Sequence, residues 1–230
     1  MGVVKVHELE VQLNRRFSNG LTGVFSFAAS SVQENRVVEE YDREPTIWQG
    51  NNNGRPYRIA ASGVYELPFG PGRAYLTKGP LGQLAGGWQV AANYDYQPGA
   101  LLGDWTNLFF YGDLDDIPLD HPTRDQWFNT DAGFEKDPAK TPAGFQKRQF
   151  PFRVDGVRGQ ALSFLNMSLT RTVRLSGART FQVRLDVQNV LNRQHWQNAN
   201  TNPTNSNFGK VTTVTQNYMR FFTFVGRVNF

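Results

Sequence analysis

Apolar and polar residues alternate one by one along most of this chain. The clearest case is segment 219–230, where every second residue is apolar and most of the residues between are polar. The apolar positions there are Phe222, Phe224, Gly226, Val228 and Phe230. Because successive side chains of a β-strand point to opposite faces, this pattern predicts a strand with one fully apolar face.

Seven segments show this alternation, and helical periodicity is nearly absent. The predicted strands cover 8–14, 21–30, 57–67, 88–97, 165–172, 181–189 and 219–230. Most alternate for about ten residues, the length that a tilted strand needs to cross a membrane, whereas strands of soluble sandwiches are nearer five or six residues. We therefore expect an all-β antiparallel meander of about seven long strands.

The connections between these strands are of two kinds. The short ones lie near 18–20 and 176–180, and the long ones lie near 34–54, 98–159 and 192–218. The two kinds alternate along the chain, so the long loops fall on one side of the sheet. This is the layout of an outer-membrane β-barrel, with short periplasmic turns and long outer loops. The connection 68–86 departs from it, because it belongs to the side of the short turns and is nevertheless long.

Aromatic side chains also favour a barrel. Tyr57 and Tyr65 lie near opposite ends of one predicted strand, and Trp88 and Tyr96 do so on the next. Amphipathic rings at both ends of a strand are typical of the two interfacial girdles of a membrane barrel. A soluble β-sandwich is the alternative, because aromatic residues also fill soluble cores. That alternative predicts short strands and two apolar faces packed together.

Composition narrows the classes of function. The 230 residues contain no cysteine, which excludes disulfides and thiolate chemistry, and no apolar run approaches the roughly 18 residues of a membrane helix. The net charge of +4 is spread along the chain without a nucleic-acid-binding motif, so we expect no nucleic-acid partner. His7, His121 and His195 are isolated, without triad order or metal-ligand spacing. We therefore expect no enzymatic activity, no cofactor and no metal.

The strand count is odd, which matters for a barrel. With Phe230 at the periplasmic end, seven strands place Met1 on the outer side, whereas bacterial single-chain barrels have an even number of strands. The opening residues 1–8 lack the apolar segment and cleavage site of a signal peptide. We therefore expect residues 1–230 to be a partial barrel, with a signal peptide and further strands upstream. Such an open sheet is expected to aggregate without detergent.

The segment RLDVQNVLN at 184–192 resembles the penultimate-strand pattern of TonB-dependent receptors. Three further segments resemble the Oar-like subgroup of these receptors, which carry a carboxypeptidase-regulatory-like domain: YRIAASGVYELPFG at 57–70, GGWQV at 86–90 and QWFNT at 126–130. The resemblance implies that the chain is the C-terminal part of a barrel of about twenty-two strands, closed by an N-terminal plug. It also implies energy from a TonB complex, although the plug and the TonB-contacting segment have no counterpart in this sequence.

The final strand resembles the C-terminal signal by which the outer-membrane insertion machinery recognises its clients. By this resemblance, the assembly signal comprises Phe222, Phe224, Val228 and Phe230. The partners implied are therefore the insertion machinery, outer-membrane lipid, the rest of the barrel with its plug, and the TonB complex.

The long loop 98–159 carries the candidate ligand contacts. Its aromatic residues include Trp105, Phe109, Phe110, Tyr111 and Trp127. Exposed aromatic side chains in loops often contact sugars or apolar solutes by stacking. The same residues can instead pack against neighbouring loops as a folded lid, or continue the adjoining strands above the membrane. The sequence leaves both interpretations open.

An acidic run at 112–120 in the same loop offers carboxylates to a hard cation such as calcium. It fails the EF-hand pattern, since Ile117 and Pro118 occupy positions that require an oxygen ligand and a glycine. We interpret the run as a solvated surface loop.

The main hypothesis is the C-terminal barrel segment of a TonB-dependent receptor in the outer membrane, which takes up an unidentified ligand. A second hypothesis is an outer-membrane anchor that displays its long loops for adhesion or assembly with other chains. A soluble β-sandwich binding module is the third.

Overall fold

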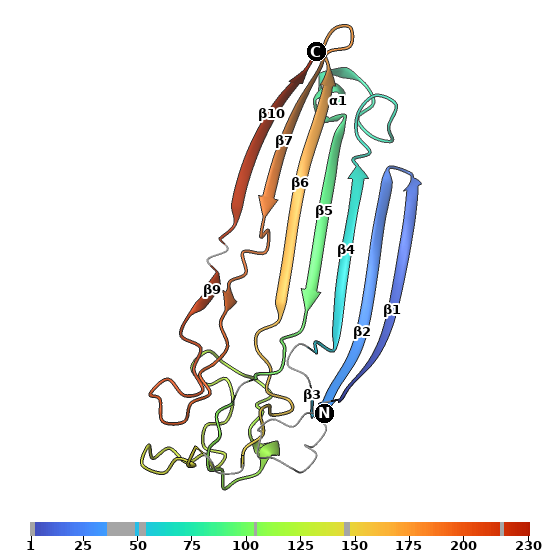
Figure 1. Cartoon of the computed structure of the whole chain (residues 1–230). Coiled ribbons are helices and arrows are strands. Elements are labelled where there is room, and N and C mark those ends of the chain that lie inside the picture. Colours follow the sequence, from blue (N-terminus) through green and yellow to red (C-terminus); the bar gives the residue numbers. More distant parts are fainter. Residues whose placement is uncertain (1–2, 36–48, 51–53, 104, 145–147, 217–218) are drawn as a thin grey trace.

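Seven long strands dominate the structure, a computed structural model that describes residues 3–35, 49–50, 54–103, 105–144, 148–216 and 219–230 (Figure 1). They are β1 (Val3–Ser18), β2 (Leu21–Asn35), β4 (Tyr57–Glu66), β5 (Trp88–Gln97), β6 (Leu162–Arg174), β7 (Thr180–Gln188) and β10 (Phe221–Asn229). Neighbours along the chain pair antiparallel in the order β1-β2-β4-β5-β6-β7-β10, so the sheet is a meander. The prediction of seven long antiparallel strands is confirmed.

The remaining elements are short. They are β3 (Gln49–Gly50), α1 (Gly79–Ala85), the 3₁₀ helix η1 (Leu114–Asp116), β8 (His195–Trp196) and β9 (Val214–Gln216). Figure 1 shows long connections gathered at one end of the sheet and shorter turns at the other, with α1 beside the turns. Most of the predicted outer loop 34–54 lies outside the described residues, apart from the end of β2, β3, which pairs with β2, and residue 54.

The first hairpin extends beyond the segments in which apolar and polar residues alternate. β1 has 16 residues and β2 has 15, and the pairing continues to Val3 opposite Asn35. Backbone hydrogen bonds between strands do not require alternation, so the ladder runs past the apolar band. At the other end, Asn19 and Gly20 have φ of 51° and 80°. Two central residues with positive φ form a type I′ turn, whose twist matches that of the strands.

The register places the apolar positions of all seven strands on one face. Phe27 pairs with Ile59, and Leu185 pairs with both Leu169 and Phe224. One row from β2 to β10 consists of Gly23, Gly63, Ala92, Met167, Val187 and Phe222, and β1 continues it with Arg15. A slip of one residue would move the apolar set of a strand to the opposite face. The alternation therefore specifies the register as well as the strands.

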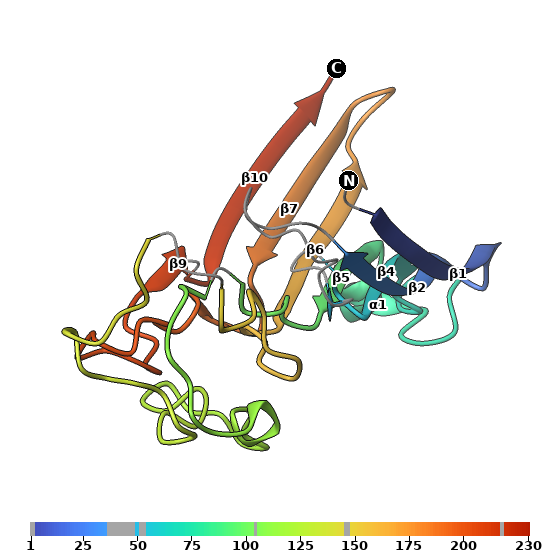
Figure 2. The same ribbon diagram turned by 60° about the horizontal axis from the view of Figure 1, so that its bottom comes forward.

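Apart from its end beside α1, this apolar face is not covered by other described residues of the chain. Leu13 is 62% exposed and Phe224 is 77% exposed. Among the described residues, the second sheet is the two-stranded pair of β8 and β9. It lies in the long connections and does not cover the apolar face (Figure 1). Figure 2 shows a single curved sheet with β1 and β10 at its two edges. The β-sandwich alternative, which requires two packed apolar faces, is therefore wrong.

Aromatic rings mark the two ends of the apolar face. The ring centroids of Tyr57 and Tyr96 are 6.0 Å apart, on neighbouring strands. Tyr65 and Trp88 lie eight residues from them, roughly 26 Å along a strand at about 3.3 Å per residue. With a tilt of about 40°, this spacing covers roughly 20 Å of an apolar band that is about 25 Å tall. In the described part of the chain, no helix has the length and hydropathy that crossing a membrane would require.

Candidate functional site

The long connections between β5 and β6 and between β7 and β10 fold into one body, which we call the outer-loop cap. It comprises the described residues of 98–161 and 189–216. In contrast to the sheet, the cap has a buried apolar core. The core consists of Leu102, Trp105, Leu108, Ile117, Phe128, Phe134, Phe150, Val154, Val157, Ala199, Phe208 and Val211. The hydrophobic core of this chain therefore lies in its loops.

Contacts between the two loops hold the cap together. The backbone N–H of Trp127 donates to the carbonyl of Gly209 at 2.7 Å, and that of Val211 donates to the carbonyl of Arg124 at 2.8 Å. The guanidinium carbon of Arg124 lies 3.6 Å from the centroid of the Trp196 ring, a cation–π contact. Because one loop supplies each side of these contacts, the two loops fold as a unit.

A buried ion pair connects the cap to the sheet. Nη1 of Arg153, in the β5–β6 connection, donates to Oε1 of Glu34 near the end of β2. The side chains are 3% and 7% exposed. Breaking a buried ion pair by removing one partner typically costs about 3–5 kcal/mol, so this contact contributes to holding the cap on the sheet. The pair therefore anchors the cap to the outer end of β2.

The predicted ligand contacts do not share one environment. Trp105 is 1% exposed, with its ring centroid 4.9 Å from that of Phe128 and 5.4 Å from that of Phe150. Of the two interpretations that the sequence leaves open, Trp105 therefore follows the folded lid, because its indole packs among aromatic rings in the cap core. Phe110 is half-buried and also contacts Phe150, at 5.3 Å. Tyr111 is 71% exposed, so a ligand can reach it.

Trp127 lines a cleft of about 260 Å³ on the cap. Leu119, Pro122 and Arg158 form part of its wall. The indole Nε1 of Trp127 donates to the carbonyl of Arg158 at 2.7 Å, which orients the ring as one side of the cleft. Phe109 is half-buried and does not line this cleft. Ligand contacts at Phe109, Phe110, Tyr111 and Trp127 stay predictions.

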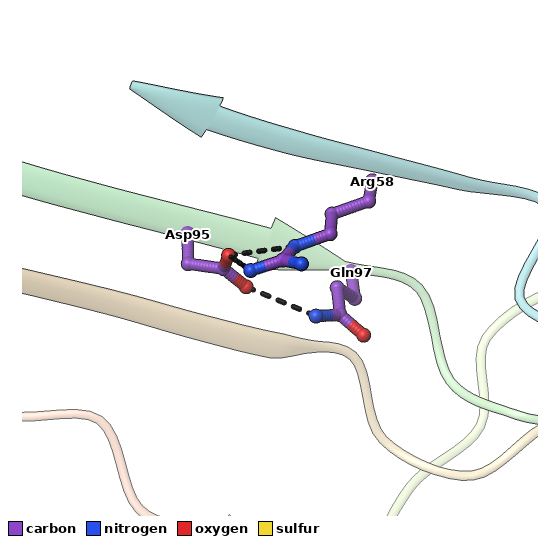
Figure 3. Close-up of polar contacts among 3 residues, drawn as sticks. All are labelled: Arg58, Asp95 and Gln97. Carbon is purple, nitrogen blue, oxygen red and sulfur yellow. Dashed lines mark hydrogen bonds and ion pairs between the residues drawn. The ribbon is translucent and has the colours of Figure 1, made fainter. Parts of the chain in front are cut away.

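The polar face of the sheet carries paired charges. Nε of Arg58 donates to Oδ2 of Asp95 at 2.8 Å, and Nε2 of Gln97 donates to Oδ1 of the same carboxylate at 3.1 Å. Figure 3 shows these three side chains converging across β4 and β5. Arg184 and Asp186 form a second pair on β7, with 3.0 Å between Nε and Oδ2. This face therefore suits contact with water or polar groups.

The predicted assembly-signal residues lie on the apolar face of β10. Phe222, Phe224 and Val228 each pair with an apolar residue of β7. Phe230 follows the strand and is strongly exposed, with the guanidinium carbon of Arg179 6.0 Å from its ring centroid. The residues form an apolar stripe at the edge of the sheet. Its recognition by the insertion machinery stays a prediction.

Comparison with known proteins decides the class of this chain. The family model described as "Outer membrane beta barrel domain" matches residues 2–223. The chain belongs to this family. No curated protein and no solved structure matches it.

As a member of this barrel family, the protein resides in the outer membrane. The apolar face therefore contacts lipid and the polar face lines the lumen, as in other outer-membrane barrels. From the general layout of such barrels, we expect the short turns on the periplasmic side and the outer-loop cap on the outer side. The family description specifies a barrel and no ligand or transport activity.

In this outer-membrane barrel, the acidic run 112–120 is part of the cap. Oδ1 of Asp113 accepts the backbone N–H of Asp115 at 3.0 Å and so caps η1. No group of three or more His, Asp or Glu side chains is placed to hold a metal ion within the described ranges. In the same cap, the backbone N–H of Asp137 lowers the pKa of Glu135, and Lys140 adds to the shift.

His195 connects the cap to β6. It is buried, and its ring centroid lies 4.4 Å from that of Phe164. Burial lowers the pKa of His195 below its usual value near 6.5, and the positive charge of Arg193 lowers it further. The unfolded chain therefore takes up this proton more readily than the folded one. The contribution of His195 to the stability of the cap is therefore fully present above about pH 6.5 and is lost as the pH falls through its lowered pKa.

We expect the cap to become protease-sensitive as the pH is lowered from 7.5 to 5.5, because protonation of His195 disfavours its buried position. The measurement is limited proteolysis of the detergent-solubilised protein over this range. His195→Gln removes the titrating group, so its cap should depend less on pH. An identical pH profile in this variant would contradict the assignment.

Proposed function

We propose that this protein is part of a TonB-dependent receptor that takes up a ligand across the outer membrane. The observation that carries the proposal is the outer-loop cap, which is folded around its own core and carries a cleft lined by Trp127. A folded cap presents a pre-formed surface, so little conformational entropy is lost when a ligand binds.

The polar face of the sheet supports passage through the barrel. The pairs Arg58–Asp95 and Arg184–Asp186 are charged groups that require a hydrated or polar lumen. The edges of β1 and β10 need hydrogen-bonding partners in the membrane, so the proposal includes further strands that close the barrel. A plug in the lumen and energy from a TonB complex follow from the resemblance of segments 57–70 and 184–192 to this class of receptor.

The cleft suggests what kind of ligand group is held. Its volume of about 260 Å³ lies just below the range of about 300–1,000 Å³ for small-molecule pockets. It therefore suits one ring or side chain of a larger ligand. Trp127, Leu119 and Pro122 offer apolar stacking surface, and Arg158 adds a positive charge. A sugar ring or an aromatic group with a neighbouring anionic substituent fits this combination.

The test is uptake by intact cells that make the protein. Radiolabelled siderophores, oligosaccharides and peptides are supplied with and without an uncoupler of the proton gradient. We expect one class to accumulate, and the uncoupler to abolish its uptake. Trp127→Leu should weaken binding of that ligand about three- to tenfold, since one aromatic contact contributes about 0.5–1.5 kcal/mol. Lys136→Ala, an exposed site on the same loop, is the control.

An outer-membrane anchor for adhesion is the second candidate. It is favoured by the same cap, because a rigid displayed body can serve as a docking surface without transport. In that case a ligand or partner chain would bind the cap, and neither the uncoupler nor loss of the TonB complex would change the outcome. Binding without energised uptake would therefore contradict the transport proposal.

A further inference from the structure

The long periplasmic connection 67–87 places its helix on the lipid side of the barrel wall. Trp88 and Arg171 are paired in register and belong to the apolar face, in line with Val90 and Leu169. Nε1 of Trp88 donates to the carbonyl of Leu84 at 3.0 Å, and Nη2 of Arg171 donates to the carbonyl of Gln83. Two side chains of the lipid-facing surface thus hold the last turn of α1. The helix therefore lies beside the membrane and not in the lumen.

The backbone of this connection is tightly packed and has a defined conformation. A Cβ on Gly82 would lie 2.2 Å from the carbonyl oxygen of Leu76, so only glycine fits there. Leu76 itself has φ of 51°, a left-handed conformation that is uncommon for leucine. A bulky residue keeps such a conformation only when the surrounding structure holds it. The geometry of the turn is therefore specific, and not that of a loose linker.

The helix exposes apolar side chains at the level of the membrane surface. Leu81 is 69% exposed and Leu84 is 64% exposed. Residues three apart lie on the same side of a helix, so the two leucines form one apolar patch. Burial in the acyl region of the inner leaflet would remove this patch from water.

A pocket of about 660 Å³ lies beside the helix. Phe69, Leu84 and Val173 supply apolar wall, and Arg73 and Arg171 supply positive charge. Arg73 also pairs with Glu66, at 2.6 Å between Nη2 and Oε2, and no carboxylate lines the pocket. Further basic residues at this end of the sheet are Arg15, Arg16, Lys78, Arg174 and Arg179. The pocket therefore combines an anion-binding group with apolar surface.

We propose that the connection 67–87 anchors the barrel to the periplasmic leaflet by binding an anionic phospholipid. Leu81 and Leu84 contact the acyl chains, and Arg73 and Arg171 bind the phosphate in the pocket beside α1. A phospholipid has both chemistries that the site offers, a phosphate and an apolar chain, and it is the lipid at the depth of the short turns. This inference needs only the barrel family and is independent of what the protein transports.

The first experiment locates α1 relative to the bilayer. Residues 1–230 contain no cysteine, so Leu81→Cys and Ser176→Cys each add the one labelling site of this part of the purified protein. A bimane label is attached, and the protein is placed in nanodiscs of phosphatidylglycerol brominated near the headgroup. We expect quenching at position 81 to be at least threefold stronger than at position 176, in the neighbouring turn. Equal quenching at the two positions would overturn the proposal.

The second experiment tests the phosphate site by native mass spectrometry with added phosphatidylglycerol. Arg73→Gln and Arg171→Gln should each weaken lipid binding roughly tenfold, the loss expected for one charge-assisted hydrogen bond. Arg174→Gln, on the lumen side of β6, should leave binding unchanged. Displacement of the lipid by millimolar inorganic phosphate would indicate a free-phosphate site and overturn the lipid assignment. If the arginine variants fail to assemble, the label at position 81 decides.

Discussion

Replacing Ala92 with arginine should block assembly of this protein in the outer membrane, whereas the same change at Ala91 should be tolerated. Ala92 lies in the apolar row of the sheet between Gly63 and Met167. Arginine on the lipid face near the middle of a barrel strand costs about 2–4 kcal/mol. Ala91 faces the lumen, where a hollow of about 430 Å³ is lined in part by Asp186. An arginine there has space and an acidic partner.

The two alanines form a matched pair, since the substitution, strand and depth are the same and only the face differs. Assembly is measured by the heat-modifiable mobility of the protein in outer-membrane fractions, and stability by urea unfolding in detergent or lipid. The expected result is loss of assembled Ala92→Arg with near-normal Ala91→Arg. Equal effects at both positions would mean that the two faces are not lipid and lumen.

The second large effect is expected at Trp105, because its side chain is the centre of the cap core. Trp105→Ala removes ring contacts with Phe128, Phe134 and Phe150, and truncation of a buried aromatic residue typically costs about 3–5 kcal/mol. The two loops share this core, so both should become sensitive to protease while the barrel strands stay protected. Limited proteolysis with mass mapping of the fragments measures this.

Two variants serve as controls for this expectation. Trp105→Phe keeps an aromatic ring and should cost much less, since Nε1 of Trp105 has no hydrogen-bond partner among the described residues. Tyr111→Ala removes an exposed ring and should leave the loops resistant, within about 0.5 kcal/mol. If Trp105→Ala leaves the loops as resistant as Tyr111→Ala does, the cap does not depend on an aromatic core.

The sheet could be predicted from the sequence because the alternation of apolar and polar residues is visible within each strand by itself. Each strand from 57–67 onward alternates within itself, and the register follows once every apolar face must meet lipid. The length of β1 was underestimated for the same reason. Beyond Leu9 toward Val3 the pairing with β2 continues, but the alternation of apolar and polar residues does not.

The cap core could not be predicted in the same way. Trp105, Phe128 and Phe208 come from irregular segments with no periodicity, and they meet only when two loops far apart in the sequence fold together. Local pattern therefore could not decide whether Trp105 contacts a ligand or packs against neighbouring loops, and the structure places it in the core. The buried pair of Arg153 and Glu34 joins residues 119 positions apart, and neither residue carries a local signal of its partner.

The helix in the connection 68–86 could not be predicted from the sequence either. The connection is longer than the short turns expected on its side of the sheet. It is long because it contains α1. Gly79 and Pro80 at the start of the helix are a recognisable helix-start signal. A helix of seven residues is nevertheless too short to show helical periodicity in the sequence. Its position on the lipid side depends on Trp88 and Arg171, which only the register brings together.

The contact of one face of this sheet with lipid, and of the other with the lumen, can be measured residue by residue along one strand. Residues 1–230 contain no cysteine, so a single cysteine at each position of 89–96 in β5 can carry a spin label in the protein reconstituted in lipid. Accessibility to oxygen dissolved in the bilayer is then measured by electron paramagnetic resonance. We expect maxima at 90, 92, 94 and 96 and minima at 89, 91, 93 and 95. A flat profile, or maxima at the odd positions, would contradict the claim.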